Sequence, residues 1–405
     1  MDLQFGKQVY EQSQKFLEQG KDVNQIAKIL CDQDKAGYNY GIGIILSGDG
    51  KPMPSSPTLL EYAAKEVASS VRGDYMNSNK IMEDVKKAVL TWQRIPEQYW
   101  KNFKIALPSD AGTGAVKTAV EVALMLNPSL NSIGIEELGW PAYKAIAKTS
   151  RIKCQEFRAD TVISGDGMLP VYQAGPMNTT GLVNSADLIA ERVQSAAKTN
   201  SPVVLDRAYS GFEFSRLVDS QPYDSIMQKS YEMQVKPYLE QGVTFCMAIS
   251  PTKCFVTFSL RPCGFLLLYC PDTSRDKDTT NILNLAVRAR GSSFEHSITR
   301  AFVKALVNDF ERLEQEHLAS LLRLCDAETL WRKFVKGTAM EYLFSDKYAG
   351  LFRNPQARPD AAIKIFNEHL YPVFSGNRCR LNITGIPDNE ELAQKHIAVF
   401  AAECF

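Results

Sequence analysis

The chain has 405 residues, of which 45% are apolar, 23% charged and 10% aromatic, a composition typical of a folded protein with room for two or three domains. Its 46 basic and 46 acidic residues cancel, so charge gives no reason to expect nucleic acid or a membrane as a partner. The amphipathic start lacks the apolar core of a signal peptide, and no apolar run is as long as a membrane span. We therefore expect a cytoplasmic protein.

The nine cysteines are scattered, without a Cys-x-x-Cys spacing, and we expect them to be reduced, buried thiols. The four histidines lie far apart and away from clusters of cysteine or carboxylate. This pattern supports neither a metal site nor a Ser-His-Asp triad.

The middle of the chain alternates short apolar runs, typical of buried strands, with segments of helical periodicity. The predicted strands are 104–108, 132–136, 152–157, 202–206, 243–249 and 263–270. The predicted helices are 112–126, 141–149, 186–198, 223–241 and 280–290. Continuous apolar strands between helices predict an α/β fold with a mostly parallel sheet that is covered on both faces.

The pattern changes in the last quarter of the chain, where one long, charged helix is predicted over 303–337. A helix (359–370), a strand (379–384) and a closing helix (389–403) follow. We expect this segment to join the N-terminal residues in a smaller α+β domain. The predicted limits are 1–54 for the N-terminal arm and part of the small domain, 55–310 for the large domain and 311–405 for the rest of the small domain.

Small residues follow the first predicted strand, in the turn Ala111-Gly112-Thr113-Gly114 that precedes a helix. Ligands of open α/β sheets collect at the carboxyl ends of strands, and the backbone N–H groups of such a turn can hold a phosphate. A tight turn without a ligand explains this pattern equally well.

A carboxylate, Asp206, ends the apolar run "VVLD", and Tyr209 follows three residues later. Taken alone, the acid is equally well explained as a helix cap or an ion-pair partner.

Two cations interrupt the apolar stretch from Cys246 to Cys270, Lys253 in "SPTK" and Arg261 eight residues later. A partly desolvated lysine has a lowered pKa and can form a Schiff base, and an arginine beside it can bind a phosphate. A lysine at a strand end that reaches solvent is the alternative.

Together these groups are what pyridoxal 5′-phosphate requires. They comprise a phosphate cradle, an acid that keeps the pyridine nitrogen protonated, and a lysine that holds the aldehyde and moves a proton.

The same motifs resemble the fold-type I, class I/II aminotransferases, closest to the aspartate and aromatic amino acid aminotransferase group, from about residue 35 to the C-terminus. The similar motifs are Ala111-Gly112-Thr113-Gly114-Ala115 (family Ser-Gly-Thr-Gly-Ala), "MNTTGLV" (Asn-Pro-Thr-Gly), Asp206-Arg-Ala-Tyr209-Ser-Gly-Phe (Asp-x-Ala-Tyr-x-Gly-Phe), "SPTKCFVTFSLR" (Ser-x-x-Lys…Arg) and "RLNITG" (the strand with the substrate arginine).

The resemblance implies pyridoxal 5′-phosphate as cofactor, bound as a covalent aldimine on Lys253. The implied cofactor-binding residues are Ala111, Gly112, Thr113, Trp140, Asn178, Asp206, Tyr209, Ser250, Lys253 and Arg261, with Tyr75 reaching the phosphate of a neighbouring subunit. The implied catalytic residues are Lys253, Asp206 and Tyr209. The implied substrate-binding residues are Gly43, Trp140, Asn178, Arg380 for the α-carboxylate and Arg288 for a distal carboxylate across the dimer.

Two positions depart from the family pattern, and the register of a third is open. Thr179 replaces a proline after Asn178, and Tyr143 stands where aspartate aminotransferases usually have a histidine that supports the acid. Arg290 lies close enough to Arg288 that either could face the substrate, and a surface ion pair of a helix-end arginine is the alternative to both.

The resemblance implies transamination between an L-amino acid, either aspartate, glutamate or an aromatic one, and a 2-oxo acid such as 2-oxoglutarate. It also implies a homodimer with shared active sites. A lyase of the same fold that uses the same cofactor and a non-catalytic protein that binds it are the alternatives.

Overall fold

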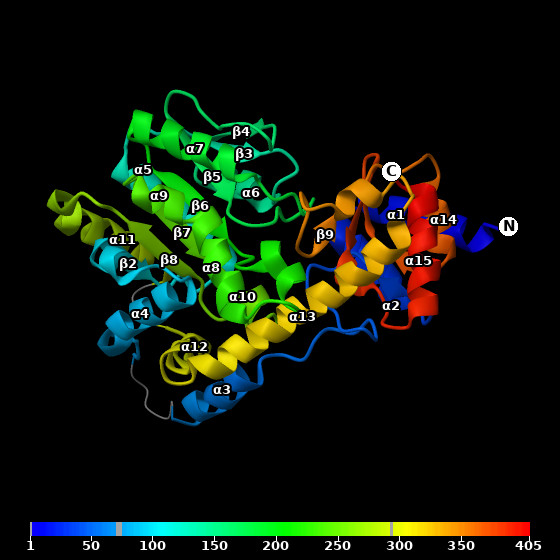
Figure 1. Ribbon diagram of the computed structural model, residues 1–405, viewed down its shortest axis with the longest axis horizontal. Helices are drawn as coiled ribbons and strands as arrows, with labels where there is room; N and C mark the ends of the chain where they lie inside the picture. The colour runs from blue at the N-terminus through cyan, green and yellow to red at the C-terminus, as the bar shows by residue number, and fades with distance from the viewer. Residues whose placement is uncertain (1, 70–74, 292–294) are drawn as a thin grey trace.

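The computed structural model describes residues 2–69, 75–291 and 295–405, and its largest feature is a seven-stranded sheet (Figure 1). The strands of this sheet are β2 (Phe103–Ala106), β3 (Ser132–Glu136), β4 (Lys153–Phe157), β5 (Met168–Gln173), β6 (Val203–Arg207), β7 (Phe245–Ile249) and β8 (Phe265–Tyr269). Their spatial order is β2-β8-β7-β6-β5-β3-β4, and within it only β8 runs against the others. The predicted mostly parallel α/β sheet is therefore confirmed.

Alternate residues of the central strands enter two different apolar cores. Cys246 and Ala248 of β7 face one core, while Phe245, Met247 and Ile249 face the other. Because a strand turns successive side chains to opposite faces, a strand covered on both sides must be apolar throughout. This explains why the central strands appear in the sequence as continuous apolar runs.

Helices cover both faces of the sheet. The first face is covered by α5 (Ala111–Leu126), α6 (Ala142–Thr149) and α11 (Asp276–Gly291). The second face is covered by α4 (Met82–Trp92), α7 (Ala186–Thr199), α8 (Tyr223–Gln234), α9 (Lys236–Glu240) and α12 (Ser297–Asn308). The short helix α10 (Pro251–Cys254) follows β7, and α3 (Pro57–Ser69) packs on α12.

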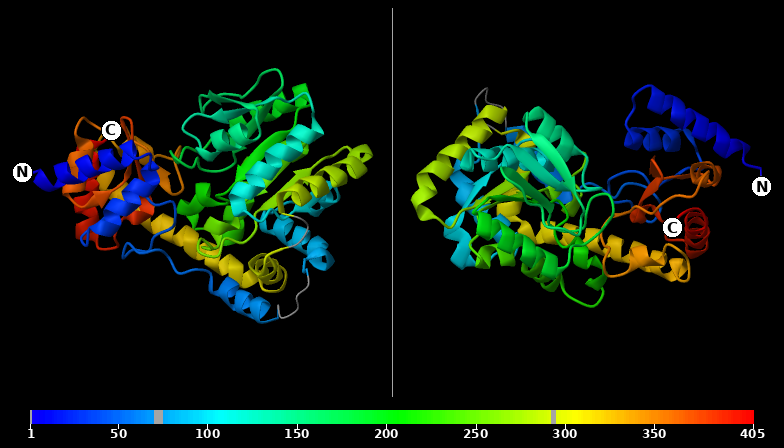
Figure 2. Two further views of the ribbon diagram at one scale, coloured as in Figure 1. Left: turned by 180° about the vertical axis from the view of Figure 1, so that it is seen from behind. Right: turned by 90° about the horizontal axis from the view of Figure 1, so that it is seen from above.

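Both ends of the chain lie in a second group of elements at one end of the molecule (Figures 1 and 2). Its helices are α1 (Gln4–Glu18), α2 (Val23–Gln33), α14 (Ala361–Asn367) and α15 (Glu390–Glu403). Its strands are β1 (Tyr38–Asn39) paired with β10 (Leu370–Tyr371), and a three-stranded sheet of β11 (Val373–Ser375), β12 (Arg378–Asn382) and β9 (Phe352–Arg353). The domain limits at residues 54 and 310 remain predictions.

The sequence misplaces some element boundaries. The helix predicted over 303–337 is two helices, α12 and α13 (Phe310–Val335), which meet at Asp309. The helix predicted over 223–241 breaks at Val235, between α8 and α9, because Pro237 cannot continue the hydrogen bonding of α8. The sequence does not indicate β5, because Pro170 lacks the N–H group of a central strand.

Among the described residues, no helix combines the length and the apolar composition that crossing a membrane requires.

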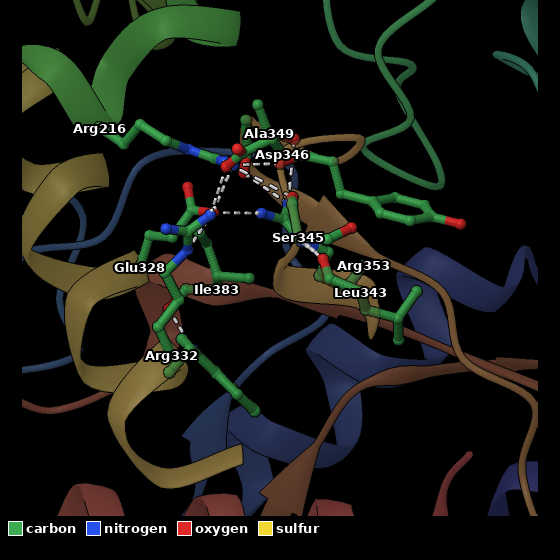
Figure 3. Close-up of polar contacts among 12 residues, drawn as sticks. Arg216, Glu328, Arg332, Leu343, Ser345, Asp346, Ala349, Arg353 and Ile383 are labelled. Carbon is green, nitrogen blue, oxygen red and sulfur yellow. Dashed lines mark hydrogen bonds and ion pairs between the residues drawn. The ribbon is translucent and has the colours of Figure 1, made fainter. Parts of the chain in front are cut away.

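A buried carboxylate on α13 joins the two groups of elements (Figure 3). Glu328, with a side chain only 2% exposed, accepts hydrogen bonds from Arg353 of β9 at 3.1 Å and from Arg216 at 2.8 Å. Arg216 belongs to the 3-10 helix η3 (Phe212–Leu217), which follows β6. One ion-pair cluster therefore links the C-terminal elements to the segment that follows β6.

Arg353 also donates hydrogen bonds to backbone carbonyls of the segment 343–353, namely those of Leu343, Ala349, Gly350 and Phe352. The same segment pairs with the loop after Asn178, through Ala349 N to Gly181 O at 2.7 Å. The cluster thus reaches a loop that carries a predicted site residue.

We expect Glu328→Gln to lower the free energy of unfolding by about 3 kcal/mol, because it leaves the Arg353 guanidinium buried without a carboxylate. Chemical denaturation measures this difference. Asp346→Asn is the control, since Asp346 pairs with the same Arg216 but its side chain is 91% exposed. This variant should lower the free energy of unfolding by less than about 1 kcal/mol. Equal losses in both variants would contradict the role of Glu328.

Candidate active site

The carboxyl ends of β5, β6 and β7 and the first turn of α5 surround a cavity of about 190 Å³. The predicted site residues that line it are Gly43, Ala111, Gly112, Thr113, Trp140, Asn178, Asp206, Tyr209, Ser250, Lys253 and Arg261. A cavity of about 550 Å³ between α1, α2 and α14 is larger, but none of the predicted site residues line it. We place the site at the smaller cavity, because its lining carries the reactive groups.

Asp206 is the last residue but one of β6, and its carboxylate is buried, 8% exposed. Tyr143 of α6 donates a hydrogen bond from its hydroxyl to Asp206 Oδ2 at 2.6 Å. Burial raises the pKa of Asp206 to about 6, although the Tyr143 hydrogen bond and the positive charge of Lys253 act to lower it. Tyr143, which the resemblance places where aspartate aminotransferases usually have a histidine, therefore contacts the acid directly.

Tyr209, Asn178 and Lys253 meet beside Asp206. Asn178 Nδ2 donates a hydrogen bond to the Tyr209 hydroxyl at 2.5 Å, and Lys253 Nζ lies 4.7 Å from the centroid of the Tyr209 ring. Lys253 is half-buried in α10, directly after β7. Because β6 and β7 are parallel neighbours, Asp206 near the end of β6 and Lys253 in the helix after β7 lie at the same edge of the sheet.

The small residues after β2 form the first turn of α5 rather than a loop before it. A Cβ atom added to Gly112 would lie 2.6 Å from the Cβ of Ser250 and 2.7 Å from its hydroxyl, so only glycine allows this approach. The N–H groups of the helix start, the Ser250 hydroxyl and the exposed Arg261 guanidinium therefore face one small space. Such a donor set fits an anion such as a phosphate.

Arg380 lies beside the cavity rather than in its lining. Its Nη2 donates to Gly41 O at 2.8 Å, two residues before Gly43, which lines the cavity, and its guanidinium carbon lies 4.5 Å from the Phe352 ring centroid. Burial lowers the pKa of Arg380 below its ordinary value. The guanidinium is thus held against the same edge of the site as Gly43.

Sequence reasoning missed residues that support Asn178. Gln173, at the end of β5, accepts a hydrogen bond from Asn178 N at 2.9 Å and lines the cavity. Buried Glu136, at the end of β3, accepts from Gln173 N at 3.1 Å and pairs with Arg192 at 3.0 Å. For Glu136 the signal available in the sequence was a polar residue at the carboxyl end of a predicted strand, as for Asp206. Gln173 gave no such signal, because the sequence does not indicate β5.

Tyr75 and Arg288 do not reach the cavity of their own chain. Tyr75 is 76% exposed, and Arg288 is exposed on α11. The side chain of Arg290 lies outside the described residues. Because Tyr75 and Arg288 were both assigned to the site of a neighbouring subunit, these two assignments remain predictions.

A half-buried lysine, a buried acid and an anion cradle at the strand ends of an α/β sheet are the groups expected in a class of enzymes that depend on a phosphorylated aldehyde cofactor. The sequence profile of the family Aminotransferase class I and II matches residues 84–330, and the chain belongs to this family. Its members use pyridoxal 5′-phosphate, so the predicted family and cofactor dependence are confirmed.

Known relatives are distant in sequence and close in fold. The aromatic-amino-acid aminotransferase of Paracoccus denitrificans is 23% identical over 304 residues, which cover 70% of this chain and 73% of that protein. The structure of the aromatic-amino-acid aminotransferase from Burkholderia pseudomallei, covalently bound to pyridoxal phosphate, superposes with a TM-score of 0.77 at 16% identity, covering 94% of this chain and 97% of that one. The structure of the broad specificity aminotransferase from Leishmania mexicana superposes with a TM-score of 0.76 at 17% identity, covering 94% of this chain and 95% of that one.

The Tyr143–Asp206 contact predicts a pH-dependent effect of Tyr143→Phe in the cofactor-free protein. The native pKa of Asp206, about 6, lies above its unfolded value, so ionising Asp206 reduces stability as the pH rises through 6. Removing the hydroxyl donor raises this pKa further. The free energy of unfolding of the variant should therefore fall below that of the wild type by about 1 kcal/mol more at pH 8 than at pH 5.

Urea unfolding at several pH values measures this difference. Tyr172→Phe is the control, because the buried Tyr172 hydroxyl contacts the backbone of Ile163 rather than a carboxylate. If Tyr143→Phe lowers the free energy of unfolding equally at pH 5 and pH 8, the role of the Tyr143 hydroxyl in supporting ionised Asp206 is contradicted.

Proposed function

We propose that the protein catalyses pyridoxal 5′-phosphate-dependent transamination between an L-amino acid and a 2-oxo acid such as 2-oxoglutarate. The amino donor in this proposal is aspartate, glutamate or an aromatic amino acid. The observation that carries it is the convergence of Lys253, Asp206, Tyr209 and Asn178 on one cavity beside the anion cradle of α5. A lyase of the same fold and a non-catalytic protein are the alternatives that the experiment below separates.

The cavity residues divide into two groups for the cofactor. The first turn of α5, Ser250 and Arg261 would hold its phosphate, because they supply N–H, hydroxyl and guanidinium donors in one place. Asp206 would face the ring nitrogen, and Tyr209 with Asn178 would contact the ring oxygen. When bound, the cofactor supplies an electron-accepting ring that stabilises negative charge at the Cα atom of the amino acid.

Asp206 has to be ionised to hold a positively charged ring nitrogen. Burial opposes this ionisation, as the pKa of about 6 indicates, but a cation at ion-pair distance favours it. The Tyr143 hydroxyl donates to the same carboxylate and keeps one oxygen in place. Asp206 is therefore suited to bind a cation and poorly suited to remain charged without one.

Lys253 has two tasks in this proposal. Its Nζ binds the cofactor covalently at rest, and the free amine then takes the proton from Cα of the amino acid and later returns a proton. The Tyr209 ring below Nζ provides a polarisable surface for the ammonium form. Arg380 would bind the α-carboxylate, and Trp140 would cover the ring plane, so that the Cα–H bond points toward Lys253.

We further propose that two copies of the chain share their active sites, with Tyr75 and Arg288 serving the site of the partner. Both side chains are exposed on their own chain, as such a role requires. An arginine at this position would select amino acids with a distal carboxylate, since guanidinium and carboxylate form paired hydrogen bonds.

Lys253→Ala should abolish the absorbance band of the lysine-bound cofactor and reduce transamination by about 10⁴-fold, because both the covalent link and the proton acceptor are removed. Spectra recorded before and after addition of single amino acids measure both effects. Lys51→Ala is the matched control, since the Lys51 side chain is 79% exposed.

The spectra also separate the alternatives. Conversion of the wild-type cofactor to its amine form supports transamination, whereas release of pyruvate or ammonia without an acceptor would indicate a lyase. A wild-type spectrum that no amino acid changes would indicate a non-catalytic protein. A normal lysine-bound band in Lys253→Ala would contradict the assignment of Lys253.

Arg288→Ala should lower kcat/KM for aspartate by about 100-fold, because one charged hydrogen-bonded pair is lost. The kcat/KM values for tyrosine and alanine should stay nearly unchanged. Steady-state kinetics with the three amino acids measure this selectivity. Arg275→Ala is the control, because Arg275 lies near the start of α11 and pairs with Asp278. Equal losses on all three substrates would contradict the role of Arg288.

A further inference from the structure

The guanidinium of Arg380 is held by a residue outside every motif of the sequence analysis. Asn24, in the first turn of α2, accepts a hydrogen bond through Oδ1 from Arg380 Nη2 at 2.6 Å. The same nitrogen donates to Gly41 O at 2.8 Å, and the Phe352 ring lies 4.5 Å from the guanidinium carbon. Two hydrogen bonds and one ring contact thus restrain a side chain that is otherwise flexible.

The side chain of Asn24 is itself oriented by its neighbours. Asp22 caps α2, and its Oδ1 accepts from both Asn24 N at 2.9 Å and Asn24 Nδ2 at 2.7 Å. With its NH₂ group directed at Asp22, the amide presents its oxygen to Arg380. The N-terminal helix therefore supplies an acceptor of defined position.

The contact leaves part of the guanidinium available. Both hydrogen bonds use Nη2, while the buried Nε has no hydrogen-bond partner within the part of the chain that the structure describes. An amide accepts a hydrogen bond without carrying charge, so Asn24 orients Arg380 without forming an ion pair with it. The Asp22 carboxylate acts on Arg380 only through its charge, while its printed hydrogen bonds go to Asn24. A carboxylate at the place of the amide would compensate the guanidinium charge and compete with an anionic ligand.

We propose that Asn24 is a positioning residue for the α-carboxylate of the substrate, holding Arg380 in its binding orientation without neutralising it. The inference rests on the proposed function, in which Arg380 binds that carboxylate. It makes the N-terminal hairpin of α1 and α2, which lies at the same end of the molecule as β9 in Figure 1, part of the substrate site. A preoriented arginine loses less side-chain freedom when its ligand arrives, so binding is tighter.

The test uses the cofactor-loaded protein at pH 8 and the variants Asn24→Asp and Asn24→Ala. Asn24 is exposed, so neither variant removes a core contact. Gln25→Glu is the matched control, because it adds the same charge to the same exposed helix turn one residue further on. The probes are 3-indolepropionate and succinate, an aromatic and a dicarboxylic acid that lack the amino group, and calorimetry measures their dissociation constants.

We expect Asn24→Asp to raise the dissociation constant of the better-binding probe by at least about 10-fold, because the new carboxylate pairs with Arg380. Asn24→Ala should raise this dissociation constant by about 3-fold, because the Arg380 guanidinium is no longer oriented, and Gln25→Glu should raise it by less than about 2-fold. In kinetics, KM for both the amino acid and the 2-oxo acid should rise with Asn24→Asp, while kcat and the absorbance of the bound cofactor stay within about 2-fold. A purely structural defect would instead change the cofactor spectrum.

Wild-type affinity in Asn24→Asp, or an equal loss in Gln25→Glu, would overturn the role of Asn24. Arg380→Lys distinguishes this failure from a failure of the proposed function, because it tests Arg380 without involving Asn24. If Arg380→Lys keeps wild-type affinity, or if the wild type binds neither probe, the proposed α-carboxylate site is itself wrong. If Arg380→Lys loses affinity and Asn24→Asp does not, only the role of Asn24 is wrong.

Discussion

A carboxylate must carry its charge at the end of a strand that is buried along its whole length, and the site is organised around this constraint. Burial raises the pKa of Asp206 to about 6, and the Tyr143 hydroxyl and the Lys253 ammonium both act against that rise. Because β6 and β7 pair in parallel, with Asp206 opposite Ala248, the carboxylate of Asp206 and the amine of Lys253 lie at one edge of the sheet. Because the Tyr143 hydroxyl is a neutral donor, the charge of the acid has to be balanced by a cation on the cavity side.

The substrate side of the site depends on a different part of the chain. Arg380 comes from the C-terminal elements, and the ion-pair cluster around Glu328 connects those elements to η3 and to the loop after Asn178. A buried carboxylate shared between two arginines is strongly destabilised when either partner is lost, so it holds one arrangement of the two groups. Asn24 then sets the orientation of the Arg380 guanidinium within that arrangement. Positioning therefore acts at two scales, that of whole elements and that of one side chain.

Local sequence was sufficient for most of the sheet. The runs that became β7 and β8 are apolar throughout, and those of β3 and β6 carry polar residues only at their ends. Helices cover both faces of these strands, and the resulting pattern is visible without a structure. Breaks within helices were harder to find, since Asp309 and Val235 interrupt patterns that are periodic on both sides. Residues that act through others, such as Gln173 and Asn24, carry no motif and become apparent only through the groups that they contact.

The sequence by itself determined the class of fold, the family and the groups that carry the chemistry, because these follow from apolar runs and from motifs a few residues long. Only the tertiary structure decided which groups meet. It placed Tyr143 on Asp206 across 63 residues of sequence, Asn24 on Arg380 across 356, and Glu328 between Arg216 and Arg353. Such contacts join residues that have no periodic or sequential relation, and their geometry arises from packing whole elements together.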